Sequence, residues 1–289
     1  MDEITDSYFD GERPLFGTRN TVIKGVTFGK GESPLKEGRD LELDDVLFTW
    51  KYPLWYCKHV KVTNTIFETM ARSGIWYTDD ITITDSSIQA PKQFRRCSGV
   101  TLDHVHFSNA EETLWTCKNV RLTNLTVNGD YFGMNSENIY IDHLDLIGNY
   151  CFDGAKNVEV HNSRLVSKDA FWNCENVTIY DSKISGEYLA WNTKNITLIN
   201  CTIESNQGLC YIDGLTMKNC RTRRTDLAFE YCKTIDAEIK GGSMSIKNPG
   251  SGKIKVDHIS GKIKVDHIDE IIQDDPEIDF SKVRIETSK

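Results

Sequence analysis

The chain has 289 residues and a formal net charge of −9 at pH 7, with 27% charged and 39% hydrophobic residues. This composition is that of an ordinary folded protein, and the excess of acid argues against a protein that binds nucleic acid by neutralising phosphates. No apolar run is long enough to span a membrane. The N-terminal stretch MDEITDSYFDGERPLF also lacks the basic region and apolar core of a secretory signal. We therefore expect a cytoplasmic protein without nucleic-acid or membrane partners.

The predicted elements begin with residues 1–19, which depart from the pattern that follows and are expected to cap the first coil. Residues 20–259 then repeat one motif, an alternating apolar/polar strand followed by a polar pair and a second short strand, as in HVKVTNTIF and NVTIYDSKI. The first apolar residue of each repeat is its anchor. The anchors are Thr21, Leu41, Val60, Ile81, Val100, Val120, Ile139, Val158, Val177, Ile196, Leu215, Ile235 and Ile254.

Successive anchors are separated by 19 to 21 residues, a regularity typical of solenoid proteins. Helical repeats are longer and space their apolar residues by three and four, whereas these units alternate with period two and carry β-branched anchors, as strands do. The sequence therefore predicts an all-β fold, a single-stranded parallel β-helix of roughly 12–13 coils with a repeat of about 19–20 residues and three parallel sheets.

Within each coil, the anchor and the residue two positions later are expected to point inward, and the residue four positions after the anchor is Asn, Asp or His in most coils. These residue types tolerate left-handed backbone angles best among non-glycine residues, so they predict a sharp turn into the second strand. A further set of asparagines stands just before the anchors and predicts a stacked ladder: Asn119, Asn138, Asn157, Asn176 and Asn195.

Residues 260–289 are expected to form a C-terminal cap or tail, which leaves one domain overall with no linker. The segment SGKIKVDHI occurs twice, at 251–259 and 260–268. Because nine residues are too few for a full coil, we expect the second copy to belong to the cap or to a hairpin.

Nine cysteines are present without any CxxC pair, and we interpret them as small buried hydrophobes.

The repeats resemble the pectin-lyase-like superfamily of right-handed parallel β-helices. More closely, ERPLF, KYPLW, DAFWNCENVTI, EYLAWNTKNITLINC, TDLAFE and SIKNPGSGKI resemble the uncharacterised domain-of-unknown-function family 3737 over nearly the whole chain. The resemblance implies a right-handed parallel β-helix and brings no activity. The motifs of pectate lyases and polygalacturonases are not apparent, apart from a superficial match at IYIDH, where Asp142 and His143 fill an ordinary turn position.

The third strand of each coil carries a second apolar column. Leu54, Phe94 and Leu114 are each followed directly by Trp or Arg, and neighbouring residues of a regular strand face opposite ways. One column is therefore expected outside. An exposed row of tryptophans suits sugar rings and equally a protein interface. The candidate ligand-binding residues are Trp55, Trp76, Trp115, Trp172 and Trp191.

Charged residues surround this row, and carboxylate pairs can act on glycosidic bonds. No catalytic residue is assigned; the weak candidates are Asp79, Asp80, Arg95, Arg96, Glu111, Glu112 and Asp153. Arg95 and Arg96 interrupt the row, where acids from adjacent coils could meet them.

His104, His106 and His143 could be interpreted as a metal site, but polar turns explain the same residues, so we predict no metal. No glycine-rich phosphate loop is present, and no cofactor is predicted.

Sequence alone does not determine the biochemical function. The preferred hypothesis is a carbohydrate-binding or carbohydrate-active protein whose tryptophan-bearing face engages a saccharide, as a hydrolase, lyase or epimerase if it is an enzyme. The alternative is a non-enzymatic scaffold that uses the same face to form a homodimer or to dock a partner. A metal-dependent enzyme is the third hypothesis.

Overall fold

The computed structural model describes residues 1–257, 263–264 and 283–287. The chain forms two compact units, Met1–Gly148 (unit 1) and Asn149–Lys289 (unit 2), and each is described by itself. All regular secondary structure among the described residues is β-strand. Both units are parallel β-solenoids, and the chain makes about 13 turns in all, which confirms the predicted fold class.

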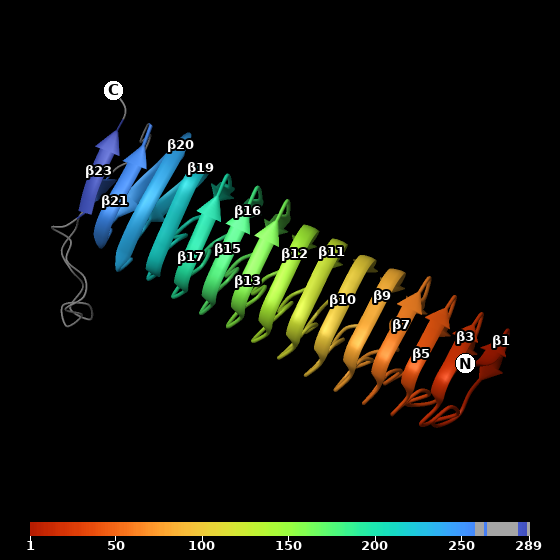
Figure 1. The fold of residues 1–289 in the computed structure, drawn as a ribbon. Helices are drawn as coiled ribbons and strands as arrows, with labels where there is room; N and C mark the ends of the chain where they lie inside the picture. The colour runs from red at the N-terminus through yellow and green to blue at the C-terminus, as the bar shows by residue number, and fades with distance from the viewer. Residues whose placement is uncertain (258–262, 265–282, 288–289) are drawn as a thin grey trace. The chain divides into compact units, whose positions relative to one another are not determined.

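Unit 1 has two regular sheets, and its strands stack in parallel from coil to coil (Figure 1). The first sheet contains β1 (Asp2–Thr5), β3 (Arg19–Lys24), β5 (Arg39–Asp44) and β7 (Lys58–Thr63). The second sheet contains β2 (Tyr8–Phe9), β4 (Thr27–Phe28), β6 (Leu47–Phe48) and β8 (Ile66–Phe67). The last four strands bend from the first sheet into the second: β9 (Asp79–Ile88), β10 (Ser98–Phe107), β11 (Lys118–Asn128) and β12 (Glu137–Ile147).

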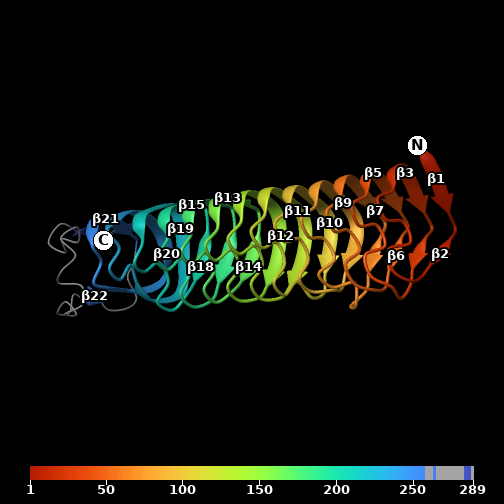
Figure 2. The same cartoon turned by 90° about the horizontal axis from the view of Figure 1, so that it is seen from below.

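Unit 2 repeats this construction. Its first sheet contains β13 (Lys156–His161), β15 (Glu175–Tyr180), β17 (Lys194–Ile199), β21 (Ser251–Val256) and β23 (Val283–Thr287). Its second sheet contains β14 (Arg164–Val166), β16 (Lys183–Ser185), β18 (Thr202–Glu204) and β22 (Ile263–Lys264). Two long strands run through both sheets: β19 (Asp213–Ala228) and β20 (Thr234–Lys247). Figure 2 shows β14 and β18 on a different side of unit 2 from β13 and β15.

The predicted anchors pair directly across neighbouring coils. Val100 lies beside Val120 in unit 1, and Val158 lies beside Val177, which lies beside Ile196, in unit 2. One anchor is shifted, because Ile235 pairs with Gly252 while Ile254 pairs with Ala237. All but the polar first anchor are hydrophobic and no more than 3% exposed, so the repeat places one apolar column along the inside of each unit.

Aromatic rings fill the second sheet's inner face in the first coils. Phe9, Phe28, Phe48 and Phe67 stack in sequence, with ring centroids 5.8, 5.1 and 4.9 Å apart. Phe48 and Phe67 have no exposed surface. Stacking adds to the free energy gained by burying each ring, so this column contributes to the core of unit 1.

The polar turn residues adopt the predicted left-handed conformation. The ten Asn, Asp and His residues that stand four positions after an anchor all have φ between 47° and 56°, from Asp45 and Asn64 to Asn219. The asparagine ladder is also present within each unit, since the side-chain amide of Asn138 donates to Asn119, and Asn176 donates to Asn157. These amide ladders satisfy polar groups at a corner of every coil.

The third side differs from the regular sheet expected there. It consists mainly of turns, and its parallel pairing in unit 1 is limited, among the described residues, to isolated bridges from Trp76 to Arg95 and from Arg95 to Trp115. The physical reason is the backbone: Phe94 and Arg96, on either side of Arg95, have φ of 52° and 54°. Alternate left-handed residues curl the chain, so it cannot remain an extended strand.

The chain termini also differ from the expected caps. Residues 1–19 do cover the next coil, but as a regular coil, since β1 pairs in parallel with β3 and β2 with β4. At the other end β22 pairs with the second-sheet part of β20, and β23 pairs with β21. The two SGKIKVDHI copies thus supply strands to different sheets. Residues 260–262, 265–282 and 288–289 of the predicted cap lie outside the described residues.

The nine cysteines are all buried and unpaired, as interpreted from the sequence. Burial raises the pKa of the Cys57 and Cys151 thiols to about 12, and the thiolate is the reactive form. We expect the folded protein at pH 8 to incorporate almost no iodoacetamide by mass spectrometry, whereas the protein in urea incorporates nine equivalents. A cysteine that reacts equally fast in both states would contradict this burial.

Candidate functional site

The tryptophans of the third side form the outward column. In unit 1, Leu54, Ile75, Phe94 and Leu114 are buried, whereas the residues directly after them are half-exposed. We call the latter set the indole column: Trp55, Trp76, Arg95 and Trp115. The structure therefore decides which of the two apolar columns faces outward.

The faces of these rings lie against each other. Trp55 and Trp76 stack with centroids 5.2 Å apart and planes within 8°. The Arg95 guanidinium lies between Trp76 and Trp115, at 4.6 and 4.7 Å from the two ring centroids, where the negative π faces attract it. Both faces of Trp76 are therefore covered, one by Trp55 and the other by Arg95.

The indole nitrogens are also bonded within the protein. Trp55 Nε1 donates to the Ser73 carbonyl at 2.5 Å, Trp76 Nε1 to the Lys92 carbonyl at 2.9 Å, and Trp115 Nε1 to the Tyr131 carbonyl at 2.7 Å. Each bond ties a ring to the backbone of the following coil. These tryptophans consequently brace the third side of unit 1.

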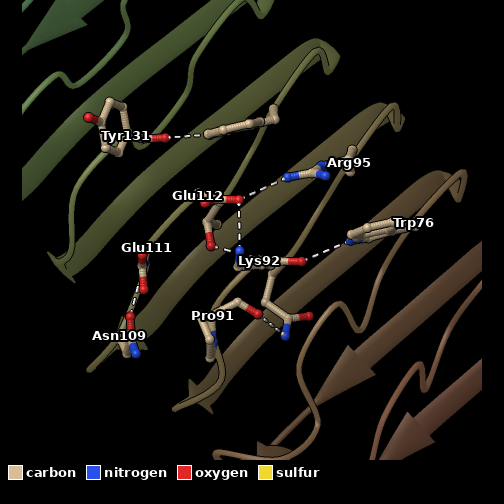
Figure 3. Close-up of polar contacts among 11 residues, drawn as sticks. Trp76, Pro91, Lys92, Arg95, Asn109, Glu111, Glu112 and Tyr131 are labelled. Carbon is tan, nitrogen blue, oxygen red and sulfur yellow. Dashed lines mark hydrogen bonds and ion pairs between the residues drawn. The ribbon is translucent and has the colours of Figure 1, made fainter. Parts of the chain in front are cut away.

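A charged cluster lies at the middle of the column (Figure 3). Glu112 accepts a hydrogen bond from Arg95 at 3.2 Å, and the same carboxylate oxygen lies 3.1 Å from Lys92 Nζ. The side chains of Arg95 and Glu112 are 25% and 24% exposed, so the pair is only partly screened by water. Of the expected acids, Glu112 is thus the one that meets Arg95, and two cations neutralise it.

A second column lies beside the first and is named the tyrosine column: Glu37, Tyr56, Tyr77 and Arg96. Tyr56 and Tyr77 stack with centroids 4.8 Å apart and planes within 5°, and the Arg96 guanidinium lies 6.0 Å from the Tyr77 ring centroid. Tyr56 is 45% exposed. Glu37 and Arg96 at its two ends are exposed, and Tyr77 is half-exposed.

Of the other candidates in unit 1, Asp79 and Asp80 have their partners outside this cluster, and Glu111 meets it only through its backbone carbonyl, which accepts a hydrogen bond from the Lys92 N–H at 2.8 Å. Asp79 accepts from the backbone N–H of Ser98 at 3.1 Å, and Asp80 lies 3.5 Å from His59 Nε2, both at the start of β9. Glu111 is exposed, and its backbone N–H donates to Asn109. The weak catalytic candidates are therefore spread over separate parts of the structure.

In unit 2, Trp172 and Trp191 are half-exposed. Trp191 stacks on Tyr211 with centroids 5.1 Å apart, and Trp172 lies 6.5 Å from Tyr150. Asp153 lies among these residues and accepts a hydrogen bond from Asn173 at 3.3 Å. Burial raises the pKa of the Asp153 carboxyl, and the Asn173 hydrogen bond offsets part of the shift.

No three His, Cys, Asp or Glu side chains of the described residues lie together as a metal site requires. His104 and His143 pair with the carboxylates directly before them, Asp103 and Asp142, at 3.1 and 2.9 Å. His106 is exposed on β10. The histidines therefore belong to polar turns and strand surfaces rather than to one ligand set.

Sequence reasoning missed Tyr56, Tyr77 and Lys92 as site residues. Each belongs to a column of equivalent residues, which can be recognised only when successive coils are aligned with one another. Tyr56 and Tyr77 stand four residues before their anchors, as Arg96 does. This constant distance of four residues from the anchor could have identified the column from the sequence.

None of the described residues forms a helix with the length and hydrophobicity of a membrane span. Among solved structures, the chain is similar to PfbA, a surface adhesin of Streptococcus pneumoniae, with 11% identity, a TM-score of 0.41 and coverage of 81% of this chain and 72% of that one. It is also similar to a mutant of the periplasmic alginate epimerase AlgG, with 7% identity, a TM-score of 0.31 and coverage of 99% and 74%.

A search among curated proteins gave no match to the chain. The family comparison is decisive, because one family model matches residues 2–286 and therefore almost every coil. Its description is "Protein of unknown function (DUF3737)". The chain belongs to the DUF3737 family.

Proposed function

We propose that this protein is a non-enzymatic scaffold that self-associates through the third side of unit 1. The observation that carries the proposal is the order of the tyrosine column, which reads acid, tyrosine, tyrosine, cation along successive coils. Backbone hydrogen bonds fix this order, since Glu37 N–H donates to the Trp55 carbonyl and Tyr56 N–H to the Trp76 carbonyl, at 2.8 and 3.0 Å. The charged ends of the column are exposed.

The column is complementary to itself under two-fold symmetry. An axis midway between Tyr56 and Tyr77 places Glu37 of one copy against Arg96 of the other, and repeats the contact on the opposite side. The same axis places Tyr56 of each copy against Tyr77 of its partner. Dimers with such a two-fold interface are the commonest symmetric assemblies of soluble proteins, which favours a second copy as the occupant.

The chemistry of the surface also suits a protein partner. Tyrosine, tryptophan and arginine dominate the residues that contribute most to protein–protein affinity. Here they stand on a rigid solenoid, braced by the indole hydrogen bonds to the following coils. Rigid aromatic side chains lose little conformational entropy on binding, so this surface is preorganised for a protein partner.

Saccharide binding is the rival proposal. It is supported by the half-exposed tryptophans and by the polar groups around them, Arg96 and Glu111. The stacking disfavours it, because Trp76 would have to give up Arg95 or Trp55 before a sugar could cover its ring face. The middle of the indole column is therefore closed to face-on stacking of a sugar, and the scaffold proposal explains the surface better.

The charge order predicts a specific reversal of dimerisation. Arg96→Glu opposes two carboxylates across the two-fold axis, so the dimer is expected to dissociate, with the dissociation constant rising at least about 100-fold. Glu37→Arg has the same effect. The double exchange of the two charges restores the dimer. Light scattering across a concentration series measures each mass.

Arg121→Glu is the matched control, because Arg121 is an exposed cation over an aromatic ring, 4.3 Å from Tyr140, on a different side of unit 1. This variant is expected to remain dimeric. A wild-type protein that is monomeric throughout, or a double exchange that fails to restore the mass, would remove the proposal. A monomer that binds oligosaccharides at millimolar concentration would support the rival.

A further inference from the structure

The charged cluster of unit 1 has a counterpart in unit 2 with one charge reversed. Arg95 stands five residues before the anchor Val100, and Asp153 stands five before Val158. In the following coil, Glu112 and Asp169 each stand eight residues before an anchor. The two clusters thus occupy equivalent positions of the coil, with an arginine in one and an aspartate in the other.

Both clusters contain a tryptophan at the same position of the coil. Trp115 and Trp172 each stand five residues before the anchor of the second coil. In unit 1 the Arg95 guanidinium lies over Trp115 at 4.7 Å and donates to Glu112 at 3.2 Å. The chain therefore builds, in unit 1, a site for a guanidinium and fills that site with its own side chain.

In unit 2 the carboxylate of this site has no such cation. Asp169 is 4% exposed, and among the described residues no group donates a hydrogen bond to its carboxylate or forms an ion pair with it within 4.0 Å. The nearby Lys168 pairs instead with Glu187 at 4.0 Å and lies 5.3 Å from the Tyr188 ring. The Asp169 oxygens are not among the fully buried side-chain atoms that lack a partner, so the carboxylate keeps some contact with solvent. Burying a carboxylate this far without a hydrogen-bond donor is still costly.

The electrostatics of Asp169 agree with this geometry. Burial raises the pKa of its carboxyl; the Lys168 charge lowers the pKa, and the charges of Asp153 and Glu187 raise it. Asp153 and Glu187 therefore lie close enough to repel the Asp169 carboxylate. In the same coils the Tyr150 and Trp172 rings stack with their centroids 6.5 Å apart. An added positive charge would relieve the repulsion and the desolvation together.

We propose that Asp153, Asp169 and Trp172 form a binding site for an organic cation, a guanidinium or a primary ammonium group supplied by a ligand in place of the arginine of unit 1. A carboxylate pair offers charge-assisted hydrogen bonds to such a group, and the indole offers its π system. This site lies in unit 2 and is independent of the self-association proposed for unit 1.

A metal ion is a weaker occupant for the same residues. A divalent cation takes six or more oxygen ligands in the case of calcium, or a complete octahedron in the case of magnesium. The described residues contain no group of three metal-ligating side chains. A guanidinium needs only the two carboxylates and the aromatic face, which are the parts present.

The probes are ethylguanidinium and its neutral analogue ethylurea, followed by the indole N–H signals of the six tryptophans in NMR spectra. Trp172→Phe identifies the Trp172 signal. Ethylguanidinium is expected to shift that signal in a saturable manner, whereas ethylurea leaves it unchanged. Asp169→Asn, which keeps the shape of the side chain, should weaken binding by about tenfold or more, because a charge-assisted hydrogen bond is lost.

The variant Asp153→Arg distinguishes binding at this site from non-specific binding of the cation to the protein surface. This variant recreates the arrangement of unit 1, so it is expected to raise the melting temperature and to abolish the response of Trp172 to ethylguanidinium. Glu112→Gln is the matched control and leaves the Trp172 response intact. An equal response to ethylurea, or a Trp172 response that persists unchanged in Asp153→Arg and Asp169→Asn, would overturn the proposal.

Two further arms complete the test. An acetylated and amidated Gly-Arg-Gly peptide binds as well as ethylguanidinium if the natural cation is a side chain of a protein, and less well if the site admits only a free small molecule.

Affinity is expected to fall as the pH is lowered from 7, because protonation of Asp153 and Asp169 removes the negative charge that holds the cation. Affinity that is independent of pH would contradict a carboxylate site.

Discussion

Phe67→Ala is expected to destabilise the protein by about 3–5 kcal/mol, the range for removing a buried aromatic ring. The Phe67 ring has no exposed surface and stacks on Phe48 at 4.9 Å. Removing it leaves a cavity in a column where the next coil cannot collapse, because the backbone ladder holds β8 between its neighbours. Urea denaturation followed by circular dichroism measures the change in the free energy of unfolding.

The neighbouring side chain provides the control for this prediction. Ile66 lies in the same strand but points outward and is 42% exposed. Ile66→Ala is therefore expected to cost less than about 1 kcal/mol. Similar losses for the two variants would mean that the inward and outward positions of β8 have been assigned incorrectly. Because solenoid repeats unfold with only nearest-neighbour coupling, hydrogen exchange should show the Phe67 effect first in the adjacent coils.

Gly148→Ala is expected to destabilise unit 1 by about 3 kcal/mol or more, since overpacking against backbone cannot relax through a rotamer change. A Cβ at this position would lie 1.9 Å from the carbonyl oxygen of Gly129 and 2.5 Å from its carbonyl carbon. Gly129 is itself held by a hydrogen bond from its N–H to the Ile147 carbonyl at 3.0 Å. The two coils must therefore separate locally to admit one methyl group.

Gly17→Ala separates this steric effect from the general cost of replacing glycine. Gly17 has φ of 69°, but a Cβ there would meet no atom within 4 Å. Its replacement is expected to cost about 1 kcal/mol through backbone strain alone. Melting temperatures of the two variants give the comparison, and an equal decrease in both would exclude the close approach of coils at Gly148.

The repeat made the regular part of the fold predictable. The anchors and the left-handed turn residues could be identified because each position recurs once per coil, and a recurring side chain of one type has one environment in a parallel stack. Val158, Val177 and Ile196 pair as expected. The expected ladder from Asn157 to Asn176 is also present.

The candidate site was predictable only in part. The meeting of Arg95 with an acid of the next coil follows from the register, but the outward direction of the tryptophans and the role of each side chain do not. Trp55 and Trp76 are 21 residues apart, and Trp76 and Arg95 are 19 apart, yet all three stack in one column. The extra residues lie elsewhere in the coil, and sequence spacing alone does not locate them.

Sequence by itself therefore determined the parallel solenoid, its period, its inward columns and its left-handed turns, because these depend on local conformation repeated at a constant interval. Tertiary structure alone decided that the third side is a series of turns, that ring faces stack on Arg95, and that Asp169 is nearly buried. The physical reason is that these contacts join residues of different coils, and their distances depend on how the turns of each coil place the backbone.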